Sequence, residues 1–404
     1  MGRQMIDSSR KNFITYIAVL VLWGLAAGGV HPVTPTMIIE RGLDSSMFGI
    51  AFAAMQFTMF LFAPFFGRLC NYVPTRRIIF WGGMGYTLSQ TVFLFSYTNA
   101  TIIAARMMAG ISCAAMQTAM PNYAINTAPD EDTRKKRITI YQTTFNVSTA
   151  AGYFTGGMLG LISVEAAIIA QVIMLAASAV LFRIICFDDT PFKVRPEHGL
   201  RLKDANPFGA FIELRHFITA ILIMLFVIIA ATSFGQYALE QSFNYAIKDI
   251  FKLSSAYNGI FKAIIALSSL VLNSTLCIWM IKKTDINVTI LPIVLGGLIP
   301  LGLLLGTETV VPFAAMDILF FVFNAIRLPL LQNLCVANST PETRNNIIGF
   351  YQSMTSFGAI FGAFLAGVLY SSGPKKPFIM AFAVFAAGTA VTMLYVIRYK
   401  TRRK

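Results

Sequence analysis

Apolar segments of about 20 residues follow one another along almost the entire chain of 404 residues. A helix of that length rises about 30 Å, which matches the hydrocarbon thickness of a bilayer. Lipid offers no water to unpaired backbone groups, so only helices and closed barrels cross it. Because the segments are long and mostly uncharged, they predict an all-α membrane protein.

Twelve segments fit this description, and charge supports the assignment. Only 12% of the residues are charged, whereas soluble domains have about a quarter. The bilayer therefore takes the place of a domain core. We expect spans at residues 13–37, 47–66, 77–97, 100–126, 139–161, 165–186, 216–245, 255–280, 286–305, 310–336, 346–370 and 376–397.

The basic residues indicate the orientation. On this topology 24 of the 32 Lys and Arg residues lie on the side of the N-terminus, five on the opposite side and three within spans. This is the positive-inside bias, so we expect both termini in the cytoplasm. The net charge of +14 is then topological, and we expect no nucleic-acid partner. We also expect the first span to be retained, because cleaving it as a signal peptide would misplace one terminus.

The chain repeats itself at an offset of 210 residues. Six residues of the first half, Thr133, Arg134, Tyr141, Gln142, Gly152 and Gly157, recur as Thr343, Arg344, Tyr351, Gln352, Gly362 and Gly367. We therefore predict two parallel six-helix repeats, residues 1–186 and 216–404. A charged, proline-containing cytoplasmic linker, residues 187–215, joins them.

Several function classes lack their sequence signals. No phosphate-binding G-x-x-x-x-G-K-[ST] loop occurs, five cysteines are scattered, and only three histidines are present. We expect no metal, no cofactor and no enzymatic activity, and we expect no signalling receptor either. A gradient of protons, of another ion or of the substrate itself is the expected energy source.

Three segments carry motifs. Between spans 2 and 3 the chain reads Gly67-Arg68-Leu69-Cys70-Asn71-Tyr72-Val73-Pro74-Thr75-Arg76. Span 4 contains Arg106-Met107-Met108-Ala109-Gly110-Ile111-Ser112-Cys113-Ala114, and span 5 contains Gly152-Tyr153-Phe154-Thr155-Gly156-Gly157. Together with the twelve spans and the repeat, these segments resemble the motifs of the major facilitator superfamily, in particular its 12-helix drug:proton antiporters.

The resemblance implies a role for the first motif as a cytoplasmic latch of one conformation. Gly67 and Arg76 match the family pattern, but Asn71 stands where the family has Asp. Because an amide carries no charge, we expect a weaker latch. The alternative is that Arg76 and Arg77 only orient the protein in the membrane.

The second motif places Arg106 inside the bilayer, where an arginine is costly unless it is paired or wet. Helical spacing puts Arg106, Gly110 and Gln117 on one stripe. In proton antiporters of the family this arginine is tied to proton transfer. The alternative is a packing arginine bonded to backbone carbonyls.

The third motif resembles the family's antiporter motif, which points to export. Its glycines, Gly152, Gly156 and Gly157, permit close helix packing, although Tyr153 replaces the family's proline. Span 11 supplies a corresponding set, Gly358, Gly362 and Gly367.

In a transporter of this shape the cargo site is expected near the bilayer midplane, between the repeats and lined by spans 1, 4, 7 and 10. The polar residues of these spans are the candidates for the substrate cavity: His31, Arg106, Gln117, Asn122, Gln236, Tyr237, Asn324 and Arg327. His31 near a helix end has the alternative of an interfacial residue.

Asp317 and Glu240 join Arg106 as the candidates for proton coupling, because carboxyl groups within a span can carry protons. The alternative for both carboxylates is a place on the wet rim of the cavity. Lys262, in span 8, has the alternative of extending outward to the interface.

The sequence therefore favours a monomeric, multi-pass transporter of the cell membrane that exports small molecules or drugs against protons by alternating access. The second hypothesis is an exporter or carrier of an anionic metabolite or a metal chelator, since Arg106, Arg327, Lys262 and His31 outnumber the deep carboxylates. A nutrient symporter is the third.

Overall fold

The computed structural model describes residues 2–43, 47–187, 189, 209, 211–212, 215, 218–252 and 255–403. The regular secondary structure of these residues is helical throughout. They form two compact units, one of Met1–Phe217 with Ser339–Ser353 and the other of Ile218–Asn338 with Met354–Lys404. The predicted linker, residues 187–215, lies mostly outside the described residues.

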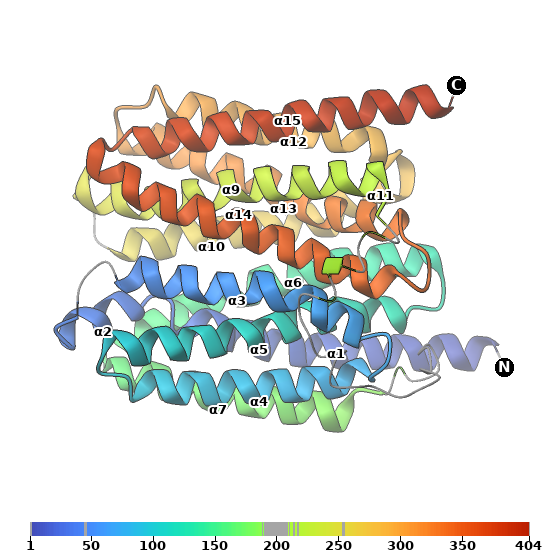
Figure 1. The fold of residues 1–404 in the computed structure, drawn as a ribbon, viewed down its shortest axis with the longest axis horizontal. Coiled ribbons are helices and arrows are strands. Elements are labelled where there is room, and N and C mark those ends of the chain that lie inside the picture. The colour runs from blue at the N-terminus through green and yellow to red at the C-terminus, as the bar shows by residue number, and fades with distance from the viewer. Residues whose placement is uncertain are drawn as a thin grey trace. The chain divides into compact units, whose positions relative to one another are not determined.

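The first unit contains seven helices among its described residues. They are α1 (Gly2–Gly29), α2 (Thr34–Glu40), α3 (Met47–Leu69), α4 (Thr75–Leu94), α5 (Asn99–Asn126), α6 (Glu131–Gly160) and α7 (Val164–Ile185). Helix α5 packs against α3 and α4, α1 packs against α6 and α7, and α4 also contacts α7 (Figure 1). Large aromatic side chains fill the core: the ring of Tyr16 stacks on that of Tyr123 at 5.2 Å, and Trp23 is buried beside Tyr86.

The second unit is built from α9 (Ala220–Asp249), α10 (Ser255–Leu272), a π-helical turn η3 (Asn273–Cys277), α11 (Ile278–Lys283), α12 (Ile286–Leu304), α13 (Val310–Ala337) and α15 (Lys376–Arg403). Helix α9 packs on α15, and α12 lies against α13 and α15 (Figure 1). Helix α10 contacts α13. Helix α14 (Arg344–Ser372) begins in the first unit and continues in the second.

Every expected span overlaps helical structure. Among the described residues, ten helical segments are long and apolar enough to cross a membrane. Helices α4 and α6 occupy the other two expected spans but carry more polar residues, so twelve crossings stay a prediction.

The first expected span, residues 13–37, is not one helix. Helix α1 ends at Gly29, a turn contains His31 and Pro32, and α2 begins at Thr34. The break has a local cause, because proline lacks a backbone N–H and cannot continue the helical hydrogen bonds.

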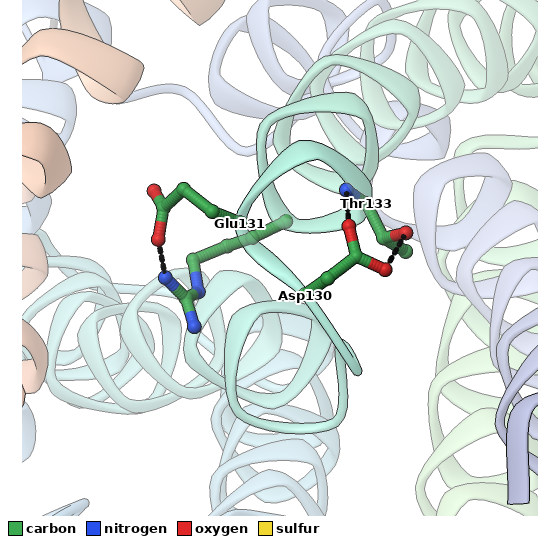
Figure 2. A network of polar contacts seen from close by, with 4 residues as sticks. Asp130, Glu131 and Thr133 are labelled. Carbon is green, nitrogen blue, oxygen red and sulfur yellow. Dashed lines mark hydrogen bonds and ion pairs between the residues drawn. The ribbon is translucent and has the colours of Figure 1, made fainter. Parts of the chain in front are cut away.

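Helix α6 begins with a side-chain cap, which Figure 2 shows. The Asp130 carboxylate accepts hydrogen bonds from the Thr133 backbone N–H and from its hydroxyl, both at 2.7 Å. These bonds lower the pKa of Asp130 below its usual value, because they favour the charged form. One residue on, Glu131 pairs with Arg134.

Candidate functional site

The glycines of the third motif bring α6 against α1 at backbone distance. A Cβ atom built on Gly156 would lie 1.8 Å from the carbonyl oxygen of Gly29, and one on Gly152 would lie 2.2 Å from that of Leu25. Any larger side chain there would force the helices apart. Gly157 differs, because the nearest atom to its built Cβ is on Pro32 at 3.9 Å, an ordinary contact distance.

The second repeat contains the corresponding contact between α14 and α9. Cβ atoms built on Gly358 and Gly362 would each lie 2.4 Å from a carbonyl oxygen of α9, that of Ala230 and that of Phe234. For Gly367, no described atom beyond its own helical turns lies within 4 Å of the built Cβ. The two pairs, α1 with α6 and α9 with α14, thus both pack through glycines, and Gly152 and Gly362 correspond at the offset of 210 residues.

The motif after α3 contacts the start of α14 within the first unit. The Asn71 side chain donates to the Asn346 oxygen at 2.7 Å and accepts from the Asn345 amide at 2.8 Å. Beside it, a Cβ built on Gly67 would lie 2.9 Å from the Cα of Gly349. The contact between Asn71 and the start of α14 is therefore made by uncharged amide groups.

Arg76, at the end of this motif, has a different partner. The Arg76 guanidinium donates to the carbonyl oxygen of Cys186 at 3.1 Å, at the end of α7. Arg76 thus ties α4 to the segment that follows α7.

Arg106 is buried in the first unit. Its guanidinium donates to the Thr34 hydroxyl at 3.1 Å and lies 3.8 Å from the centre of the Phe93 ring. One turn further along α5, a Cβ built on Gly110 would lie 2.1 Å from the Met55 carbonyl oxygen, so α5 closely approaches α3. The Arg106 side chain therefore links α5 to α2 through its hydrogen bond to Thr34.

The remaining first-unit candidates are spread out. His31 stacks on the Tyr153 ring at 5.1 Å, in the turn after α1. Asn122 is buried and donates to the Asn345 carbonyl oxygen at 3.5 Å, while Gln117 is partly buried. The partners of His31 and Asn122 are Tyr153 and Asn345, whereas the Arg106 guanidinium contacts Thr34 and Phe93.

In the second unit, Arg327 is the centre of a hydrogen-bonded cluster. Its guanidinium donates to Asn324 Oδ1 at 2.9 Å, to Gln236 Oε1 at 3.0 Å and to the Thr232 hydroxyl. The side chain is 1% exposed. Asn324 and Arg327 belong to α13, while Thr232 and Gln236 belong to α9. The cluster therefore joins these two helices, and Tyr237 follows it along α9, partly buried.

A second cluster of polar side chains in this unit lines a small pocket. Glu240 of α9 and Lys262 of α10 form an ion pair, with side chains 18% and 24% exposed. Asp317 of α13 is 2% exposed, and its Oδ1 has no hydrogen-bond partner among the described residues. The other lining residues are apolar: Phe243, Phe261, Ile265 and Phe321.

Lys262 shows what sequence reasoning missed. It does not extend outward to the interface, because its ammonium group contacts Glu240 and lies 5.3 Å from the centre of the Phe321 ring. Two opposite charges near the outer ends of consecutive spans could have suggested this pair. Asn345 and Asn346 gave no comparable signal, since amides on a helix occur in many settings.

A buried amide on the π-helical turn was also missed. Neither side-chain polar atom of Asn273 has a hydrogen-bond partner among the described residues. Among all the described residues, no group of three or more His, Cys, Asp or Glu side chains could hold a metal ion.

Comparisons with known proteins agree with this architecture. The model of the Major Facilitator Superfamily matches residues 13–327. The chain is 20% identical over 395 residues to Multidrug resistance protein 2 of Bacillus subtilis (strain 168), covering 97% of each chain. It is 22% identical over 395 residues to Quinolone resistance protein NorA of Staphylococcus aureus (strain MRSA252), covering 96% of each.

A solved structure shows the same fold. The human organic anion transporter MFSD10 (TETRAN) superposes with a TM-score of 0.81 at 18% identity, over 95% of this chain and 99% of that chain. With the family model matching more than half of the chain, the protein is a multi-pass transporter of the cell membrane that belongs to the Major Facilitator Superfamily.

Proposed function

We propose that this transporter is a proton-coupled exporter of small molecules or drugs that works by alternating access. The observation that carries the proposal is the pocket of Glu240, Lys262 and Asp317 inside the second unit. We further propose twelve crossings, both termini in the cytoplasm, and a monomer.

The chemistry of Asp317 supports proton coupling. A buried carboxylate with an oxygen that lacks a hydrogen-bond donor is costly while ionised, and protonation relieves that cost. A group that is more stable when protonated in one environment, and ionised when water reaches it, can carry a proton. Glu240 shares the pocket and is the second candidate carrier.

The direction of transport rests on relatives and on the third motif. Two relatives with almost complete coverage are named for drug resistance, and a membrane transporter supports resistance when it moves the drug out of the cell. The close contact between α1 and α6 involves the glycines that resemble an antiporter motif. Export of drug-like molecules follows as the simplest function for this chain.

The proposed cargo residues are the polar side chains of spans 1, 4, 7 and 10. In the second unit the Arg327 guanidinium donates hydrogen bonds to Gln236 and Asn324, and Tyr237 follows Gln236 on α9. In the first unit we propose that His31, Arg106, Gln117 and Asn122 serve the cargo or the coupling.

Transport in proteoliposomes tests the proposal. Lipophilic cations such as tetraphenylphosphonium, and small organic anions, are offered with and without an imposed pH gradient. We expect cation movement that follows the gradient. If neither the rate nor the final accumulation responds to the gradient, the protein is not proton-coupled.

A second candidate is an exporter of organic anions. Arg106 and Arg327 are both buried, and both donate hydrogen bonds to neutral side chains, so each could give up such a bond to an anion. The structural relative named as an organic anion transporter points the same way. Movement of anions alone in the same assay, lost in Arg327→Gln, would favour this function.

A further inference from the structure

The pocket of the second unit holds an unequal number of opposite charges. It contains two carboxyl groups, Glu240 and Asp317, and one ammonium group, Lys262. Its remaining walls are aromatic and aliphatic, so they cannot balance a charge by hydrogen bonding. With all three groups ionised, the pocket carries one net negative charge.

Other ionisable groups whose side chains are described do not alter this sum. Tyr237 is close to Glu240 on α9 but is neutral at ordinary pH. Arg327 lies ten residues after Asp317 on α13, about 15 Å along the helix, and its guanidinium bonds Asn324, Thr232 and Gln236. Helix α12 contains no Asp, Glu, Lys or Arg, and α15 has such residues only near its ends.

The contacts divide the two carboxyl groups into different roles. The Lys262 ammonium pairs with Glu240 and lies over Phe321, so Glu240 is the carboxylate that it contacts directly. Asp317 lies within electrostatic reach of both groups, yet its Oδ1 has no hydrogen-bond partner among the described residues. Asp317 is therefore the group left to take an added positive charge.

We propose that Lys262 is a coupling residue, an internal cation that limits the pocket of Glu240 and Asp317 to one exchangeable proton. Without this ammonium group, both carboxyl groups would need a proton before the pocket became neutral. With it, one proton suffices. The inference rests on the proposed proton coupling and adds to it the number of protons that the site holds.

Infrared difference spectroscopy tests this inference without reference to any cargo. The full-length protein is reconstituted in lipid, and spectra at acidic and alkaline pH are subtracted to isolate the C=O stretch of protonated carboxyl groups in the apolar region. We expect one such band in the wild type, and we expect Asp317→Asn to remove it. In Lys262→Gln the band area should about double, and the added part should disappear in Glu240→Gln/Lys262→Gln.

Two further variants keep the test decisive. Lys262→Arg retains the positive charge and should keep a single band of wild-type area. Glu240→Gln leaves Lys262 to balance Asp317, so the wild-type band should be strongly reduced although Asp317 is still present. This second expectation applies even where Lys262→Gln does not fold.

The outcomes separate this inference from the proposed function. An unchanged band area in both Lys262→Gln and Glu240→Gln would overturn the role of Lys262, whatever the transport assay shows. If the spectra change as expected but transport ignores the pH gradient, the charge rule holds and the proposed proton coupling fails.

Discussion

Two buried polar groups of α13 lie ten residues apart and differ in how completely they are bonded. Arg327 donates to three neutral acceptors and leaves little unsatisfied. Asp317 lies in a pocket with a lysine and a second carboxylate, and one of its oxygens has no partner among the described residues. A fully bonded group holds one arrangement, whereas an unsatisfied one gains by changing its protonation or its partner. The first should therefore matter for stability and the second for transport.

The largest expected effect is on coupling at Asp317. In Asp317→Asn, transport driven by a pH gradient should fall by about 100-fold or more, because an amide neither takes up nor releases a proton. The measurement is gradient-driven accumulation of tetraphenylphosphonium in proteoliposomes. Exchange of labelled for unlabelled cation without a gradient is the control and should persist. Retained gradient-driven accumulation would show that Asp317 does not carry the proton.

Arg327 should show the opposite pattern. Arg327→Met keeps most of the side-chain volume but leaves the acceptors of Asn324, Thr232 and Gln236 without their donor. We expect a loss of about 2–4 kcal/mol in the free energy of unfolding. Thermal unfolding of the purified protein measures it, and Asp317→Asn is the matched control, because it removes no hydrogen bond to Oδ1. Equal destabilisation by both substitutions would remove the distinction between the two groups.

The helical architecture could be predicted from the sequence because few backbone structures can cross a bilayer. Apolar length predicted where helices lie, and the repeat at an offset of 210 predicted that Gly152 and Gly362 have equivalent places. Both glycines do meet a neighbouring helix at backbone distance. The prediction of one continuous span over residues 13–37 is wrong, because the helix ends at Gly29 and Pro32 lies in the turn that follows.

Side-chain partners were harder to predict than helices. Asp317 and Glu240 stood out as rare charges in apolar spans, but the direction of the Lys262 side chain depends on packing that no spacing rule gives. Asn71 likewise contacts residues 274 and 275 positions away. Whether these residues work as proposed stays a prediction.

Glycine packing sharpens the same comparison, because it predicts stability effects with no charge involved. Gly156→Ala would place a methyl group 1.8 Å from the Gly29 carbonyl oxygen, and the shift this forces should cost about 1–3 kcal/mol. Gly157→Ala is the neighbouring control, since its nearest contact is 3.9 Å. Thermal unfolding of both variants measures the difference. Two equal unfolding temperatures would mean that α1 and α6 do not pack this closely.

The amide contact at Asn71 is expected to have a smaller effect. Asn71→Ala removes the bonds to Asn345 and Asn346, each worth about 1 kcal/mol, so a loss of about 1–2 kcal/mol should appear in thermal unfolding. Asn71→Asp keeps an acceptor for the Asn345 amide but places a carboxylate against the Asn346 oxygen, so recovery should be partial. An Asn71→Ala variant as stable as the wild type would show that this contact does not stabilise the protein.

The smallest effect is expected at Asp130, a carboxylate outside the membrane-spanning segments that caps α6 through hydrogen bonds to Thr133. Its bonds to Thr133 hold its pKa below the ordinary 3.8, so its contribution to stability is fully present above pH 3.8 and is lost as the pH falls through the folded-state pKa. Asp130→Ala should therefore lower the unfolding temperature slightly at neutral pH, and the difference from wild type should shrink under more acidic conditions. Asp130→Asn is the matched control: it retains an acceptor for the Thr133 N–H, so its loss of stability at neutral pH should be smaller. Like alanine it does not titrate, so its difference from wild type should change with pH in the same sense and by the same amount. Neither variant should change gradient-driven transport. If Asp130→Ala altered transport while its stability stayed at the wild-type level, the division between carboxylates that stabilise and carboxylates that couple would fail.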